Sequence, residues 1–376
     1  MLRQSLALVA VLSALAPLSV IKPAAAQDLQ PPRTRTFYLA AEEVEWDYAR
    51  SGRNRIAGRA FGETEAVFLE PGPRRIGRIY TKALYRAYTD STFTTPAPVP
   101  PEWEHLGALG PVLRGAVGDT IRVVFHNRTR YPFSVHPHGV FYAKDSEGAG
   151  SADGTAGRDT LDDAVPPGGT HTYVWPIPER AGPGPGDPSS VAWLYHSHVS
   201  TPRDTNAGLI GAILVTGQDH ARPDGSPVDV DREFVTLFKI YDENQSPYLE
   251  ENVRTHTGDP ESVDPDDEGF IESNLLHAIN GTVYGNLPVM TMGVGERVRW
   301  YVLGLGNEAD LHTVHWHGNT GIETGQRLDT LGLLPGESLE IDMRPDNPGK
   351  WLFHCHVDDH MMGGMQAFYR VLPAGG

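Results

Sequence analysis

Cysteine is almost absent from this chain of 376 residues, which contains Cys355 and no other. A single cysteine excludes a framework of internal disulfides. Beyond Ala26 no stretch is apolar enough to span a bilayer. Basic residues are few, with 31 Lys and Arg against 48 Asp and Glu, which argues against nucleic acid or an anionic membrane as a partner. The acidic charge favours a cationic substrate or mere solubility, and solubility accounts for most of it.

The N-terminal segment 1–26 has the pattern of a secretory signal peptide. Arg3 is positively charged, residues 6–20 are apolar, and the three alanines at 24–26 form a cleavage site. A membrane anchor is the alternative, but the apolar run is short and Pro17 interrupts it. We therefore predict a cleaved signal and a periplasmic or extracellular protein. A free cysteine survives in such a compartment only when it is buried or bound to a metal.

The residues that follow Cys355 carry soft and borderline metal ligands. His360 lies five residues further on and Met365 five beyond that. A blue-copper site has two histidines and a cysteine thiolate in one plane, with a methionine as a weak axial ligand. In a strand, the flanking His354 and His356 would point to the face opposite Cys355. The pattern predicts one metal on one side of the strand and a second site on the other.

The composition indicates an all-β protein. Glycine and proline are abundant, at 41 and 31 residues, long helical periodicity is missing, and short β-branched runs recur between turn signals. Residues 36–46 alternate as a strand would. About 350 residues remain after the signal, enough for two ordinary domains.

An internal repeat defines these two domains. Four blocks return in the same order: residues 117–125 as 294–302, 133–139 as 312–318, 167–170 as 335–338, and 193–199 as 351–357. We predict two copies of one β-sandwich, at 30–220 and 230–373. The first copy carries an insertion at 144–164, and the acidic segment 259–268 is expected to be a solvated loop.

The two copies differ at the candidate copper ligands. Where the second copy has His312, Cys355 and His360, the first has Phe133, Ser197 and Pro202. The first copy therefore cannot hold a cysteine-ligated copper. Both copies keep His-x-His pairs, namely His136/His138, His196/His198, His315/His317 and His354/His356.

A His-x-His pair in a strand places both imidazoles on one face, where they can serve one metal or two adjacent ones. One such pair is often an ordinary structural feature, but four equivalent pairs in an internal repeat are not. Imidazole with thiolate and thioether selects copper over hard cations. Zinc would also bind imidazoles, but a redox-inert ion gives no reason for a cysteine between two metal-ligating histidines.

With these motifs the sequence resembles the multicopper oxidases over almost the whole mature chain. The resemblance implies two cupredoxin-like, Greek-key β-sandwich domains and four coppers per active unit. It implies a type 1 copper at His312, Cys355, His360 and Met365, a type 2 copper at His136 and His315, and a type 3 pair at His138, His196, His198, His317, His354 and His356. The last two form a trinuclear cluster that reduces O2 to water with four electrons. The type 1 copper takes electrons singly from the substrate, and Cys355 connects the two sites.

Each copy contributes four of the eight cluster histidines, so the cluster is expected at a contact between unlike domains. Two-domain members of this family assemble as homotrimers, with each cluster between the first domain of one subunit and the second domain of the next. A head-to-tail ring is the closed geometry for such a contact. We therefore predict a homotrimer.

Generic family members oxidise phenols and aromatic amines. Residues 136–148, 204–211 and 270–281 are similar to the ceruloplasmin and hephaestin branch, the ferroxidases. This resemblance implies that Glu272, His277 and Asp359 bind Fe2+. Isolated polar residues of this kind are more often ordinary loop and edge residues. The scarcity of methionine, with seven in all, makes Cu+ a weaker candidate substrate.

The same branch implies roles for the insertion. Lys144, Asp159, Asp162 and Asp163 match positions that hold Ca2+ through a backbone carbonyl and carboxylates, and such oxygen ligands suit that ion; a solvated acidic loop is the alternative. Tyr142 is a candidate auxiliary electron donor near the cluster, and Asp153 a candidate proton relay.

Two other classes stay open. Copper nitrite reductases also have two domains and three subunits, but their type 1 site lies in the first domain and they lack the type 3 pair. A non-catalytic copper carrier would need no cysteine between two metal sites.

Overall fold

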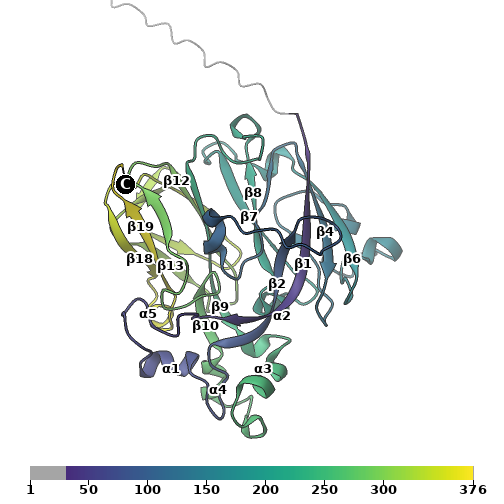
Figure 1. Cartoon of the computed structure of the whole chain (residues 1–376). Helices are drawn as coiled ribbons and strands as arrows, with labels where there is room; N and C mark the ends of the chain where they lie inside the picture. The colour runs from purple at the N-terminus through teal and green to yellow at the C-terminus, as the bar shows by residue number, and fades with distance from the viewer. Residues whose placement is uncertain (1–30, 376) are drawn as a thin grey trace, which may run out of the picture.

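The computed structural model describes residues 31–375, so the predicted signal peptide lies outside the described residues. Strands arranged in four sheets dominate the chain, and the described helices are short (Figure 1). The expected all-β class is confirmed. The strand expected at 36–46 is also present, as part of β1 (Thr34–Asp47).

Two four-stranded sheets form from the first part of the chain. The first has the order β2-β1-β4-β6, and the second has the order β3-β8-β7-β5. Besides β1, the bounds are β2 (Ile79–Tyr88), β3 (Leu113–Ala116), β4 (Thr120–Asn127), β5 (His136–Pro137), β6 (Thr170–Pro176), β7 (Ser190–His196) and β8 (Ile210–Thr216). Side chains from both sheets, including Ile121, Tyr173, Trp175 and Ile213, are buried in one core cluster.

The second part of the chain repeats this arrangement with extra edge strands. Its sheets have the orders β10-β9-β12-β17-β14-β15 and β11-β19-β18-β13-β16. The bounds are β9 (Arg232–Asp242), β10 (Leu275–Ile279), β11 (Met290–Gly293), β12 (Val298–Gly304), β13 (His312–Trp316), β14 (Gly321–Glu323), β15 (Gln326–Leu328), β16 (Thr330–Leu333), β17 (Ser338–Met343), β18 (Gly349–Cys355) and β19 (Gln366–Leu372).

The two halves of the chain that repeat in sequence also repeat in the way their strands pair. The parallel pairs β1 with β4 and β3 with β8 correspond to the parallel pairs β9 with β12 and β11 with β19. The antiparallel pairs β7 with β8 and β5 with β7 correspond to β18 with β19 and β13 with β18. The domain limits 30–220 and 230–373 stay a prediction.

The helices lie between strands. They are α1 (Glu63–Leu69), α2 (Thr201–Ala207), α3 (Leu249–His256), α4 (Glu268–Ser273) and α5 (Asp358–Met362), with short 3-10 turns η1 (Pro101–Leu106), η2 (Lys144–Ser146), η3 (Gly157–Thr160), η4 (Glu179–Ala181), η5 (Gln218–His220), η6 (Glu243–Gln245) and η7 (Pro260–Ser262). None of the helices within residues 31–375 is long and apolar enough to cross a membrane. The acidic segment 259–268 is largely exposed, as expected.

A buried ion pair joins the two parts of the chain. Lys82 on β2 contacts Glu243 after β9, and both side chains are fully buried. Charges buried in this way are costly unless further hydrogen bonds satisfy them. The Tyr48 hydroxyl donates to Glu243 at 2.5 Å, and the Lys82 ammonium donates to the Asn206 carbonyl at 2.7 Å. These contacts set the orientation of β9 against β2.

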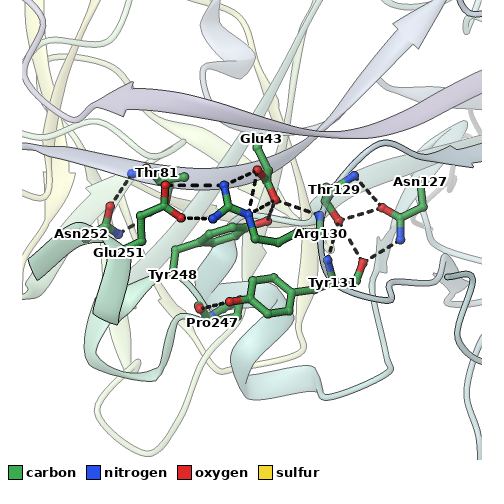
Figure 2. Close-up of polar contacts among 10 residues, drawn as sticks. All are labelled: Glu43, Thr81, Asn127, Thr129, Arg130, Tyr131, Pro247, Tyr248, Glu251 and Asn252. Atoms are coloured by element: carbon green, nitrogen blue, oxygen red, sulfur yellow. Dashed lines mark hydrogen bonds and ion pairs between the residues drawn. The ribbon is translucent and has the colours of Figure 1, made fainter. Parts of the chain in front are cut away.

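A second polar cluster fastens α3 across β1 and β2. Figure 2 shows Arg130 between the carboxylates of Glu43 and Glu251, with Tyr248 beside Glu43. Burial raises the pKa of Glu43, but the Arg130 contacts outweigh it, so the pKa lies below its ordinary value. The Asn252 side chain also accepts from the Thr81 backbone N–H at 2.7 Å. Half-exposed pairs add little stability, so this cluster mainly orients α3.

His105 provides a pH-sensitive contact between the two parts. Its Nε2 accepts from the Val235 backbone N–H at 3.0 Å, and its Nδ1 lies 2.9 Å from the Glu102 carbonyl, so the ring is neutral. Burial lowers the pKa of His105 to about 4. The unfolded chain therefore binds the extra proton first as the pH falls below about 6.5, and folding loses stability toward pH 4.

Replacing His105 with Gln is expected to remove this part of the acid sensitivity. Between pH 7.5 and 5 the His105 contribution to unfolding free energy should fall by about 2 kcal/mol. Urea unfolding of the copper-free chain at both pH values measures it, with exposed His220→Gln as control. An equal pH dependence in wild type and His105→Gln would contradict the assignment.

Candidate copper centres

The candidate type 1 residues converge in the buried core of the second part of the chain. His312 begins β13, Cys355 ends β18, and His360 lies in α5. The Cys355 Sγ is 3.8 Å from His312 Nδ1 and 3.6 Å from His360 Nδ1, and the two Nδ1 atoms are 3.2 Å apart. The register that pairs Val314 with Cys355 brings β13 and β18 together here. One thiol and two imidazole nitrogens therefore face a common point.

The loop between Cys355 and Met365 is closed by its own backbone. The Cys355 N–H donates to the Met365 carbonyl at 3.1 Å, and the Met365 N–H donates to the His360 carbonyl at 2.9 Å. Met365 is fully buried, and its role as an axial ligand stays a prediction. Burial raises the pKa of the Cys355 thiol. A bound cation would offset that shift, since a coordinating thiol is deprotonated.

Asp310 supports this site and was not found from the sequence. Its carboxylate lies 3.5 Å from His312 Nε2 and is almost fully buried. Backbone N–H groups of Ile240 and Asn307 donate to it at 2.6 and 2.9 Å. A carboxylate on the outer nitrogen fixes the ring orientation and leaves Nδ1 for a metal. The one feature of the sequence that could have indicated this role is the position of Asp310, two residues before His312.

The four histidines of the first copy form one group. His138 Nε2 is 3.1 Å from His196 Nε2, and the His136 ring centroid is 5.0 Å from that of His198. His136 Nδ1 contacts the Glu147 carbonyl at 2.6 Å, and His196 Nδ1 contacts a carbonyl at 2.9 Å. Backbone carbonyls therefore hold Nδ1, which leaves Nε2 of these two rings directed toward the group.

The four histidines of the second copy form a matching group. His354 Nε2 is 3.1 Å from His315 Nδ1 and 3.0 Å from His317 Nε2. The ring of His356 lies 5.5 Å from that of His315. His354 Nδ1 contacts the carbonyl of Cys355 at 2.7 Å. The thiolate-imidazole site and this group are thus joined through Cys355.

The strands end before the second histidine of each His-x-His pair. In the structure His136, His196, His315 and His354 lie in strands, whereas the second histidine of each pair lies just beyond the strand end. The rings still gather because strand register places His136 opposite His196 and His315 opposite His354.

Burial favours the neutral form of three of these imidazoles. It lowers the pKa of His138 to about 4, of His196 to about 3 and of His354 to about 4. Their lone pairs are therefore available near pH 7. Within residues 31–375 no nitrogen or ring contact joins the first group of four to the second. In one chain the eight histidines make two separate half-sites.

The candidate iron residues are partly brought together. His277 on β10 is buried, and its ring lies 5.3 Å from that of His360. Burial, with His360 adding to it, lowers the pKa of His277 to about 4. Asp359 is exposed on α5 beside His360, and Glu272 is exposed on α4, which leads into β10. No contact joins Glu272 to His277 or Asp359 in the described part of the chain.

The insertion holds a buried carboxylate. Asp162 is fully buried, its Oδ2 accepts from the Gly148 N–H at 2.7 Å, and its Oδ1 has no partner within the described residues. Burial, then Asp162, raises the pKa of Asp163. Asp159 is exposed. Among residues 31–375, the candidate calcium ligands are not gathered into a compact metal-binding group, so calcium stays a prediction.

The other two residues of this region lie in different surroundings. Tyr142 is 40% exposed, with its ring 5.8 Å from that of His136, and its role as an auxiliary electron donor stays a prediction. Asp153 pairs with Lys144 at 2.5 Å, and this contact holds its pKa well below the ordinary value. Lys144 also contacts Glu147. The relay role of Asp153 stays a prediction, and a carboxylate that stays ionised near pH 7 holds no proton to donate.

Comparison with known proteins identifies the family. Two profiles, both described as multicopper oxidase, match residues 107–220 and 252–375. The chain belongs to the multicopper oxidase family. Human ferroxidase HEPHL1 is 48% identical over 341 residues, human hephaestin 45% over 343, and human ceruloplasmin 42% over 346. Each match covers 90% of this chain but 29 to 31% of the relative. The chain thus spans about a third of the length of these relatives.

Solved structures show the same fold. A multicopper oxidase matches with a TM-score of 0.56 and 20% identity, covering 90% of this chain and 89% of its own. A copper nitrite reductase from Nitrosomonas europaea has the same TM-score at 17% identity, covering 90% and 94%. At such identity these matches speak for the fold alone. The expected cupredoxin-like architecture is confirmed.

Proposed function

We propose that this protein is a copper oxidase that couples the one-electron oxidation of Fe2+ to the four-electron reduction of O2 to water. The observation that carries this proposal is the position of Cys355. Its thiol faces His312 and His360, while its carbonyl contacts His354 of the second four-histidine group. A site for single electrons and a site for several metals are therefore one residue apart along the chain.

The residues present fit copper. A buried thiol without a disulfide partner meets two imidazole nitrogens, and such soft and borderline donors select copper. The proposed ligands are His312, Cys355, His360 and Met365 for type 1 copper, His136 and His315 for type 2, and His138, His196, His198, His317, His354 and His356 for type 3. Bound copper would supply electron acceptance at the first site and O2 reduction at the others, with four coppers per active unit.

The protein's own groups position these ligands. Asp310 orients His312, and the Cys355 carbonyl orients His354. The rings of His312 and His354 are held by strands β13 and β18, so electron transfer between coppers bound at the two sites would need little rearrangement. Tyr142, beside His136, is proposed as an auxiliary electron donor.

The proposed assembly is a homotrimer. The arrangement of the histidines supports it, because the eight histidines of one chain form two separate half-sites. Three copies arranged head to tail would match the first four-histidine group of each chain with the second group of its neighbour.

Fe2+ is preferred as substrate over phenols and aromatic amines. His277 lies against His360, and the carboxylate of Asp359 precedes that ligand directly. Imidazole and carboxylate groups suit iron, and carboxylates favour the ferric product. Glu272 is the third proposed iron ligand. Relatives named ferroxidase, hephaestin and ceruloplasmin support this choice, while laccase-type oxidation of organic substrates is the second candidate.

Steady-state O2 uptake with Fe2+, a phenol and an aromatic diamine tests the function. Four Fe2+ should be consumed per O2, with water as product. Release of nitric oxide from nitrite, or copper binding without O2 uptake, would overturn the proposal.

Removing the iron carboxylates should separate the substrates. Glu272→Ala and Asp359→Ala should each lower kcat/KM for Fe2+ by about 10- to 100-fold, while a bulky diamine is oxidised at the wild-type rate. Asp358→Ala, which removes the neighbouring exposed charge, is the matched control. Equal losses on iron and diamine, or no loss on iron, would exclude the iron site.

Export and calcium complete the proposal. We place the protein in the periplasm or outside the cell because of the predicted signal at residues 1–26. Calcium at Asp162 and its neighbours would satisfy the unpartnered Asp162 Oδ1.

A further inference from the structure

A cleft connects the two parts of the chain beside the first four-histidine group. Its volume is about 830 Å³. One wall is the segment 178–187 with residues 191–194 of β7. The other is Gly336, in the turn before β17, with Ser338 and Glu340 on β17 itself. The cleft extends to His138. A second cavity of about 450 Å³, lined by His136 and Tyr142, shares His138, Arg180 and Trp193 with it.

Glu340 is a partly buried carboxyl group that faces this cleft. One oxygen, Oε1, accepts from the Ala192 backbone N–H at 2.7 Å. Among the described residues, no other side chain forms a hydrogen bond with the second oxygen. Glu340 thus has one oxygen anchored to β7 and one available to exchange a proton with water in the cleft.

The surroundings of Glu340 place its proton exchange near neutral pH. Burial is the largest cause and Asp187 adds to it, while the Ala192 N–H and Arg299 act in the opposite direction, so the pKa rises to about 7. The charged and titratable groups on the adjoining elements are Glu179, Arg180 and Asp187 on the loop, His138 at the cleft end, Tyr195 and His196 on β7, Arg299 and Tyr301 on β12, and Asp342 on β17.

We propose that Glu340 is the acid that passes protons along this cleft to O2 as it is reduced beside His138. The proposal rests on the oxidase function proposed above. Reduction of O2 to two waters takes four electrons, supplied by four Fe2+ that become Fe3+, and four protons, which must come from solvent. Glu340 gives its proton to water on the side of His138 and regains a proton from solvent at the open end of the cleft. Glu340 acts through water in the cleft and does not touch O2 itself, so its role is to hold and supply protons at a fixed position.

This assignment distinguishes Glu340 from Asp153. A proton donor is most effective when its pKa lies near the working pH. The Lys144 contact keeps the Asp153 carboxylate ionised. Glu340 has no such cation at hydrogen-bond distance within the described chain, since Arg299 pairs with Asp342.

The first test reads the carboxyl group itself, without turnover. Infrared difference spectra of the full chain against Glu340→Gln, with and without copper, should show a protonated carboxyl band that disappears with a midpoint near pH 7. Gln keeps the acceptor for the Ala192 N–H, so folding is preserved. If Glu340 is ionised throughout pH 5 to 9, the proposal is overturned.

The second test measures reoxidation of the fully reduced enzyme by O2 against pH. Wild type should slow as the pH rises through about 7, whereas Glu340→Gln should be about 10- to 100-fold slower below pH 7 and lose that inflection. Glu337→Gln, three residues earlier and outside the cleft, is the control with an unchanged profile. An unchanged profile in Glu340→Gln would overturn the role of Glu340 alone. A wild-type chain that consumes no O2 would instead overturn the oxidase function.

Discussion

Replacing Cys355 with serine is expected to abolish the blue absorption of the protein and to lower Fe2+-dependent O2 uptake by more than about 100-fold. Loss of a group that merely orients a ligand already costs about 10- to 100-fold in metal affinity or activity, and loss of the thiolate itself should exceed that. The chain contains no second cysteine to replace it. The hydroxyl of serine is nearly the same size, so the fully buried position should remain packed.

Copper analysis and visible spectroscopy check this result. The Cys355→Ser protein should retain the copper held by histidines and lose the copper of the thiolate site. Val314→Ala is the matched control, because Val314 is the strand partner of Cys355 and is equally buried. That variant should be less stable yet remain blue. A Cys355→Ser protein with full activity toward Fe2+ would refute the role of the thiolate.

Two inactive variants are expected to restore each other when they assemble together. One variant, His138→Ala with His196→Ala, loses the first four-histidine group, and the other, His317→Ala with His354→Ala, loses the second. In a head-to-tail ring, a junction between an intact first group and an intact second group forms at random in about one of four contacts. Co-expression should therefore recover about a quarter of wild-type activity per chain from two preparations that have almost none.

Differently tagged variants allow the mixed assemblies to be purified and measured. As a control, each variant is co-expressed with a differently tagged copy of itself. These assemblies also carry both tags but should stay inactive. Inactive mixed rings, or a copper-loaded monomer that is active in sedimentation experiments, would refute clusters shared between subunits. The test needs no assumption about the reducing substrate, since any electron donor reports the junction.

Local patterns were sufficient for much of the site. Cys355, His360 and Met365 are close in the chain, so a short closed loop brings them together whatever the remainder of the fold does. The His-x-His spacing likewise keeps each pair of rings adjacent. The spacing does not show where the strands end, and each strand ends before the second histidine of its pair.

Contacts between distant segments were outside the reach of sequence reasoning. His277 lies against His360 although the two are far apart along the chain; only the resemblance to the ferroxidase branch placed His277 near this site, and the chemistry of its local sequence does not indicate the contact. Asp310 becomes a partner of His312 because β9 supplies the Ile240 N–H that holds its carboxylate. Glu340 faces a cleft whose other wall is a loop from the first part of the chain. Burial there raises its pKa, and the alternation of residues along β17 does not predict that burial.

The sequence by itself determined the all-β class, the duplication, and which residue types gather around Cys355, because these follow from periodicity, repetition and short loops. The tertiary structure alone decided the pairing of β13 with β18, the contact of His277 with His360, and the surroundings of Glu340 and Asp310. These depend on how sheets pack across the chain, and burial, charge proximity and strand register exist only once distant segments are in contact.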